Sequence, residues 1–284
     1  MIGNKLACAC VMSLAVALCV PEAAATKPAD TASLPAPDAA LQAAINGSWR
    51  DQVYAKRDIY RHPGQTLAFF GIKPTQTVIE ITPGGGWYSE ILAPYLREKG
   101  KYVAAVVDPG AVPEGRSRDY AQRARDELES KLKAKPQIYG APTIVAYAPS
   151  APVFGADNSA DLVLTFRNVH NWRMAGNAEA MFQGFYKVLK PGGVLGVVEH
   201  RAKADVPADD KSGYVGQAQV IAMAEAAGFK LAGKSELNAN PRDTKDYPNG
   251  VWTLPPSNNH EKADDAKYQA IGESDRMTLK FVKR

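Results

Sequence analysis

The sequence predicts an α/β fold: a doubly wound, mainly parallel sheet of seven strands that closes with an antiparallel hairpin at its C-terminal end. Three observations predict it. Short β-branched runs alternate with amphipathic helical segments. A glycine turn, Gly84–Gly86, directly follows the first of these runs. The last two strand-type segments are separated by a polar stretch without a strong helical pattern, so we expect them to pair antiparallel.

The individual elements follow from periodicity and from helix-ending residues. The predicted strands cover residues 77–81, 102–107, 143–147, 161–166, 194–198, 229–236 and 277–282. The predicted helices cover residues 49–60, 65–70, 87–98, 120–133, 178–189 and 214–227. Between the last two strands lies a predicted loop over residues 237–275, and a loop of this length is usually functional or mobile.

The first 25 residues differ in composition from the rest of the chain. Lys5 gives a positive start, residues 6–20 are almost wholly apolar, and Ala23–Ala25 offers the small residues that a signal peptidase reads. This pattern predicts a secretory signal peptide over residues 1–25 and a periplasmic or otherwise exported protein. Weaker alternatives are an uncleaved anchor and lipid attachment at Cys19. We expect no stable membrane insertion after cleavage, because the apolar stretch is short.

Composition limits the remaining functional classes. Residues 26–45 are rich in Ala, Pro, Asp and Thr, which predicts a flexible linker before a folded domain over residues 46–284. The net charge of +4 is mild, and no basic cluster with interleaved aromatics argues for nucleic acid. All three cysteines lie in the predicted signal peptide, so the mature chain would have neither a disulfide nor a thiolate nucleophile.

The glycine turn predicts a ligand site at the carboxyl edge of the sheet. Glycines there let a ligand approach the backbone, and the following helix N-terminus favours an anionic group. Asp108 ends the second strand, where a carboxylate would accept hydrogen bonds from a ribose diol. A nucleoside-bearing cofactor is therefore expected. A nicotinamide dinucleotide is the competing cofactor, but Ser89 stands where its third glycine would be.

Four segments together resemble class I S-adenosylmethionine-dependent methyltransferases: "VIEITPGGG", "AAVVDP", "DLVLTFRNVHNW" and "LKPGGVLGVVEHR". More narrowly, "RHP", "TPGGGWYSEILAPYL" and "GVWTLPP" are similar to a group of exported, predicted methyltransferases. The resemblance covers residues from about 65 to the C-terminus. It implies a Rossmann-like methyltransferase fold and S-adenosylmethionine as the cofactor.

The resemblance also implies roles for individual residues. Glu80 would orient the glycine turn, and Gly84 and Gly86 would contact the methionine part of the cofactor. Asp108 would bind the ribose hydroxyls, and Asn168 would lie near the sulfonium.

Two positions depart from the family pattern. Thr82 stands at the position of the turn's first glycine, and we expect it to bind the cofactor with Gly84 and Gly86. Pro83 predicts an extended backbone at Thr82. The third strand ends in Ala148-Pro149, which offers no acid for the adenine amino group.

Candidate catalytic residues follow the fourth and fifth strands. His170 is the first choice of general base, because imidazole accepts a proton near neutral pH; a structural histidine is an equally weighted alternative. Glu199 and His200 end the fifth strand and complete the catalytic candidates. These three residues could instead bind a metal, although no i, i+4 pairing supports this, and no metal is expected. Arg167 and Arg201 are either rim salt-bridge partners or ligands of an acidic substrate.

Other polar and aromatic residues have two interpretations each. Tyr60, Arg61 and His62 either face the cofactor or end a helix with favourable cations. Trp172 and Trp252 either wall a pocket or belong to the core. The polar side chains of the long loop form either a substrate lid or a solvated loop; they include Asn238, Asn240, Arg242, Asp243 and Asp246.

These patterns predict an S-adenosylmethionine-dependent methyltransferase that acts on an unidentified, small-molecule acceptor. No "NPPY"-like tetrapeptide follows the fourth strand, which argues against amino groups of nucleic acids and proteins. The alternative is an exported, non-catalytic ligand-binding protein on the same fold. A dehydrogenase on a related fold is the third hypothesis. The oligomeric state does not follow from the sequence.

Overall fold

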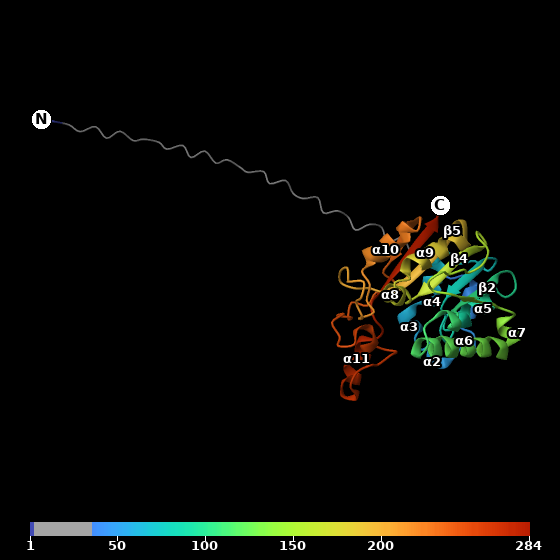
Figure 1. Cartoon of the computed structure of the whole chain (residues 1–284). Coiled ribbons are helices and arrows are strands. Elements are labelled where there is room, and N and C mark those ends of the chain that lie inside the picture. The colour runs from blue at the N-terminus through green and yellow to red at the C-terminus, as the bar shows by residue number, and fades with distance from the viewer. Residues whose placement is uncertain (3–35) are drawn as a thin grey trace. The chain divides into compact units, whose positions relative to one another are not determined.

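The computed structural model describes residues 1, 2 and 36–284. Most of the predicted signal peptide and residues 26–35 of the predicted linker lie outside this range. Of the two units into which the chain divides, the larger, Leu34–Arg284, carries the fold (Figure 1). In the part that is described, no helix has both the length and the apolar character needed to cross a membrane.

Seven strands of the described chain form one mixed sheet, in the order β3-β2-β1-β4-β5-β7-β6. The first five strands are mutually parallel, and β7 pairs antiparallel with both β5 and β6. This confirms the predicted fold class and its C-terminal hairpin. The strands are β1 (Thr77–Ile81), β2 (Lys101–Val107), β3 (Thr143–Tyr147), β4 (Ala160–Phe166), β5 (Leu189–His200), β6 (Phe229–Ser235) and β7 (Arg276–Lys283).

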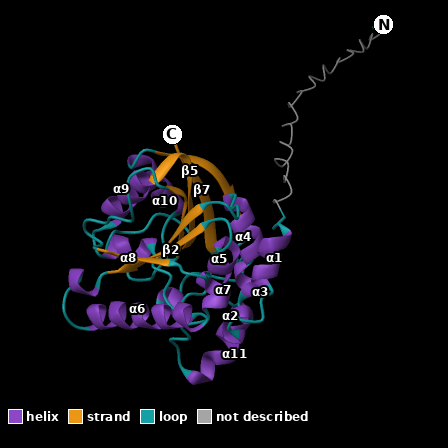
Figure 2. Cartoon of the chain, turned by 90° about the vertical axis from the view of Figure 1, so that its right-hand side faces the viewer, coloured by secondary structure: helices purple, strands orange, loops and turns teal. Residues whose placement is uncertain are grey.

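Helices cover both faces of this sheet (Figure 2). One apolar core lies beneath α8 (Val169–Met174), α9 (Ala178–Val188) and α10 (Gln217–Ala226). The core of the other face involves five helices. They are α1 (Ala39–Ile45), α4 (Pro63–Phe70), α5 (Ser89–Leu96), α6 (Arg116–Ala134) and α7 (Pro136–Tyr139). The alternation along β1 produces the two layers, because Ile79 and Ile81 face the first core and Val78 faces the second.

Two N-terminal predictions differ from the structure. Residues 39–45, expected in the linker, form α1, which Asp38 caps and which buries Leu41 and Ala44 against the core. The helix expected over residues 49–60 is two short helices, α2 (Gln52–Ala55) and α3 (Asp58–Arg61). Asp51 caps α2, while Asp58 starts α3 and pairs with Arg50 at 2.6 Å.

The long loop between β6 and β7 is tied to the domain. Asn238 donates to Thr66 and Thr278, and Asn240 donates to two backbone carbonyls near β7. Asp243 accepts hydrogen bonds from the Tyr214 hydroxyl and the Asp275 amide. The loop contains α11 (Asp265–Ile271). These polar side chains therefore fasten the loop, which explains why a hairpin carries so many of them.

A buried carboxyl joins β1, β2 and α5 beneath the glycine turn. Glu80 is 2% exposed and accepts hydrogen bonds from Ser89 at 3.0 Å and Tyr102 at 2.7 Å. Burial raises the pKa of Glu80 to about 7, although both hydrogen bonds lower it.

The pKa of Glu80 predicts a specific pH dependence of stability. Between its unfolded value of 4.5 and its folded value of about 7, the folded state holds a proton that the unfolded state releases. Stability conferred by this group is therefore greatest below pH 4.5 and falls as pH rises to 7. Relative to wild type, Glu80→Gln should gain about 3 kcal/mol over that range. Urea unfolding at several pH values measures this, and a pH-independent difference would contradict it.

Gly196 sets the distance between α4 and the sheet. A Cβ at Gly196 would lie 2.7 Å from Phe70 Cγ and 2.8 Å from Leu164 Cδ2. Gly196→Ala should therefore lower the free energy of unfolding by about 1–3 kcal/mol through overpacking. Gly233→Ala on β6 is the matched control, because its nearest contact would be 3.4 Å from Phe69. Equal melting temperatures for the two variants would refute the prediction.

Candidate functional site

A cavity with two lobes lies at the carboxyl ends of the parallel strands. The larger lobe, about 1000 Å³, lies between the end of β2, α6 and α8. The smaller lobe, about 380 Å³, lies between the glycine turn, the α2–α3 segment and the loop that precedes β7. The lobes share several lining residues and so form one site: Thr82, Pro83, Gly84, Tyr120, Asn168, His170, Asn171 and Trp252.

The backbone of the glycine turn is left-handed at Thr82, Gly84 and Gly86, with φ values of 50°, 58° and 84°. The expected extended conformation of Thr82 is wrong. Its amide donates to Ala105 at 2.8 Å, and its hydroxyl lies 2.6 Å from the Tyr147 hydroxyl. These contacts outweigh the local preference before Pro83, and Thr82 adopts the conformation that a glycine would favour there.

The two glycines that were predicted to contact the cofactor, Gly84 and Gly86, have different surroundings. A Cβ at Gly84 would meet no protein atom within 4 Å, and Gly84 borders both lobes. Its backbone is therefore open to a ligand. Gly86 borders neither lobe, and a Cβ there would lie 2.9 Å from Leu128 Cδ1 of α6. Gly86 therefore permits close packing of the turn against α6.

Asp108 lies at the end of β2, as predicted, but its side chain does not line the cavity. Its Oδ1 accepts a hydrogen bond from the Gly110 amide at 2.9 Å. The neighbouring wall of the larger lobe is apolar and includes Val106, Val107 and Ala111.

Asn168 borders both lobes and holds two strand ends together. Its amide donates to the Ile81 carbonyl at 3.0 Å and to the Thr165 hydroxyl at 3.1 Å. The ends of β1 and β4 are thus held side by side beneath the cavity.

The three predicted catalytic residues lie together where β4 and β5 end. Glu199 is fully buried, and its Oε1 lies 3.0 Å from His170 Nδ1. The same carboxylate accepts backbone N–H bonds from Val169, His170 and His200 at 2.6, 3.3 and 2.8 Å. With Nδ1–H donated to Glu199, Nε2 of His170 carries the lone pair. His170 lines both lobes, so both predicted interpretations, structural and functional, have geometric support.

His200 lines the smaller lobe and stays neutral. Its Nδ1 lies 2.5 Å from the Ser274 hydroxyl. Burial, followed by nearby positive groups that include Arg167, lowers the pKa of His200 well below its ordinary value. His170, Glu199 and His200 have candidate ligand atoms within 4.8 Å of one another. Glu199 is a poor metal ligand here, however, because both of its oxygens already accept N–H bonds.

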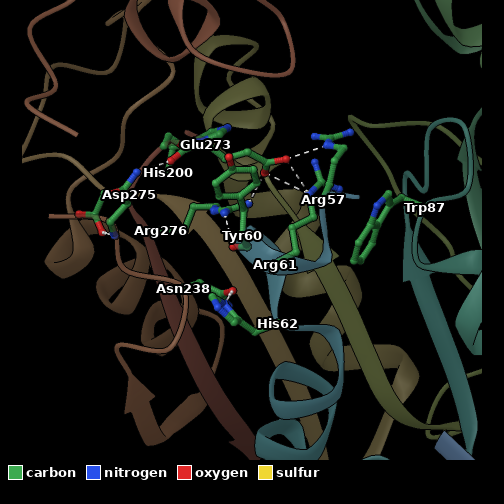
Figure 3. Close-up of polar contacts among 12 residues, drawn as sticks. Arg57, Tyr60, Arg61, His62, Trp87, His200, Asn238, Glu273, Asp275 and Arg276 are labelled. Carbon is green, nitrogen blue, oxygen red and sulfur yellow. Dashed lines mark hydrogen bonds and ion pairs between the residues drawn. The ribbon is translucent and has the colours of Figure 1, made fainter. Parts of the chain in front are cut away.

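Sequence reasoning missed an arginine–glutamate cluster beside the smaller lobe (Figure 3). Glu273 contacts Arg57 at 2.7 Å, Arg61 at 3.1 Å and Arg276 at 2.7 Å. Burial alone would raise the pKa of Glu273, but Arg276, Arg61 and the other arginines hold it well below its usual range. The available signal was "GESDR", in which Glu273 and Arg276 stand three positions apart at the start of a buried strand.

Of the other predicted site residues, some line the cavity and some do not. Arg61 and Arg167 line the smaller lobe, and Trp172 lines the larger one. Arg201 instead pairs with Asp275 and Glu236, as its salt-bridge interpretation expected. His62 does not line the cavity; its ring lies 3.5 Å from Asn238 (Figure 3).

Comparisons with known proteins support the fold. No family model matches the sequence, and no curated protein matches it. The structure is similar to a SAM-dependent methyltransferase from Aquifex aeolicus, at 16% identity and a TM-score of 0.53, covering 81% of this chain and 93% of that one. It is also similar to the [4+2]-cyclase SpnF, at 15% identity and a TM-score of 0.53, covering 88% of this chain and 98% of that one. The chain therefore has a Rossmann-like methyltransferase fold.

Proposed function

We propose that this chain is an S-adenosylmethionine-dependent methyltransferase that acts on a small-molecule acceptor. The observation that carries the proposal is the open backbone of Gly84 between the two lobes of the cavity. A ligand that spans both lobes must cross this turn. The similar Aquifex aeolicus protein is a SAM-dependent methyltransferase, which supports this cofactor over a nicotinamide dinucleotide.

The size and lining of the site suit this cofactor. Ligand pockets usually measure about 300–1,000 Å³, and each lobe falls in this range. Val106, Val107 and Ala111 would contact the nucleoside in the larger lobe, and the turn at Gly84 would contact the amino-acid part. When bound, the cofactor supplies an electrophilic methyl group on a sulfonium.

His170 is suited to accept a proton from the acceptor. The Glu199 carboxylate orients the imidazole through Nδ1 and stabilises the imidazolium that proton transfer would form. Nε2 is left for the acceptor, because Nδ1 contacts Glu199 and His170 borders both lobes. Asn168 keeps the strand ends, and therefore the turn and His170, at a fixed separation.

The predicted signal peptide leads us to propose further that the protein works in the periplasm or in another exported location. This proposal rests on residues 1–25 of the sequence alone. Fractionation of cells that express the full chain, with N-terminal sequencing of the product, tests it. Recovery of an uncleaved chain from the cytoplasm would refute it.

Cofactor binding tests the proposed function directly. Wild type should bind S-adenosylmethionine and S-adenosylhomocysteine saturably in a calorimetric titration, and NAD should not bind. Gly84→Ala places a methyl group where the ligand would approach, so its affinity for S-adenosylhomocysteine should fall by at least about tenfold.

Gly192→Ala is the matched control for this variant. Gly192 also has a positive φ, 77°, and a Cβ there would likewise meet nothing within 4 Å. It lies in β5, and it does not line the cavity. Both variants share the backbone strain, and only Gly84→Ala should lose cofactor affinity. A folded wild type that binds neither adenosyl compound would refute the proposed function.

A further inference from the structure

We infer that the smaller lobe binds an oxyanion, a carboxylate or phosphate group, carried by the methyl acceptor. This inference rests on the proposed function and names the substrate class for the same site.

Positive charge exceeds negative charge beside this lobe. Of the described residues, Arg57, Arg61 and Arg167 line the lobe, and Arg276 pairs with the lining residue Glu273. Glu273 is the carboxylate that contacts this group, and it pairs with three of the four arginines. The remaining lining carboxyl, Glu80, bonds instead to Ser89 and Tyr102. The arginines therefore keep a surplus of positive charge that one carboxylate cannot neutralise.

Of these four arginines, Arg167 is the one whose guanidinium has no partner among the described residues. Among residues 36–284, no side chain or carbonyl lies within hydrogen-bond or ion-pair distance of its guanidinium, although its backbone amide donates to Val198 at 2.7 Å. Its φ of 61° is left-handed, directly after β4, and its side chain lines the smaller lobe. Burial, partly offset by Glu273, lowers the pKa of Arg167 to about 10, so the group stays charged at neutral pH.

The paired arginines also keep unused donors. The Nη2 atoms of Arg57 and Arg61 and the Nε of Arg276 are buried without a hydrogen-bond partner in the described structure. Arg61 is 3% exposed, and a small cavity of about 10 Å³ lies between Arg61, Arg167 and Arg276. Unpaired buried donors are costly, and the planar guanidinium fork matches carboxylate and phosphate oxygens. An oxyanion in the lobe would pair with the Arg167 guanidinium, which lines it, and would offset the surplus charge of the cluster.

The acceptor is a better source of this anion than the cofactor. S-adenosylmethionine has a carboxylate, but it also has a sulfonium and an ammonium group, so it brings net positive charge. Bound over the glycine turn, it would increase the positive charge of a site that already has unpaired Arg167. Neutralising both requires negative charge from the second ligand. The Trp252 ring and His200 border the same lobe and would contact the rest of the acceptor.

A titration with inorganic phosphate tests this inference, with sodium chloride at matched ionic strength as the blank. Wild type should bind phosphate saturably, both alone and with saturating S-adenosylhomocysteine present. Arg167→Gln should weaken phosphate binding by at least about tenfold while changing S-adenosylhomocysteine affinity by less than about threefold. Arg167→Lys, which keeps the charge, should recover part of the phosphate affinity. Arg123→Gln on the exposed face of α6 removes the same charge and should leave phosphate binding unchanged.

The outcomes separate the possible sources of the anion. Displacement of phosphate by S-adenosylhomocysteine, or an equal loss of both ligands in Arg167→Gln, would assign the arginines to the cofactor carboxylate and overturn the inference. Absence of phosphate binding, or phosphate binding independent of Arg167, would also overturn it. Arg167-dependent phosphate binding in a wild type that binds no adenosyl compound would support the anion pocket and refute the methyltransferase.

Discussion

The ion-pair cluster around Glu273 is the constraint on which the site depends. It joins α3 and the residue before it to the start of β7, across more than 200 residues of sequence. Arg61 also lies over the Trp87 ring, 4.8 Å from its centroid, and the Trp87 indole donates to the Tyr54 carbonyl. Removing one partner of a buried ion pair leaves an uncompensated charge, so the loss of any one member would destabilise the whole cluster. The ion pairs of Glu273 therefore hold one wall of the smaller lobe and, through Arg61 and Trp87, the position of the glycine turn.

The fold could be predicted from local signals because each strand carries its own. All the described strands except β5 match their predicted ranges to within one residue, since each is a short apolar or alternating run. α1 was missed for a physical reason. Its seven residues have the Ala-rich composition of a linker, and a helix that short forms only when Leu41 and Ala44 pack against α5 and the core.

The candidate site also has a part that the sequence predicts and a part that depends on contacts between distant residues. The rule that ligands bind beyond the carboxyl ends of parallel strands depends on topology alone. It led to His170 and Asn168, which line the cavity, and to Glu199, which contacts His170. The conformation of Thr82 depends on Tyr147 of another strand, and the direction of Asp108 depends on the Gly110 amide that it caps. The arginine cluster brings together residues from both ends of the chain. The spacing of Glu273 and Arg276 indicates one ion pair, but no spacing within the sequence encodes the contacts of Glu273 with Arg57 and Arg61.

The similarity to both a methyltransferase and a [4+2]-cyclase shows that this fold does not determine its chemistry. Side chains at the cavity must do so. Arg61, Arg167 and Arg276 all lower the pKa of His200. The same positive potential would lower the pKa of any acidic proton on a ligand in the smaller lobe. An anionic acceptor would thus be held and made easier to deprotonate by one set of charges. His170, whose Nδ1 lies 3.0 Å from Glu199 Oε1, would accept that proton through Nε2.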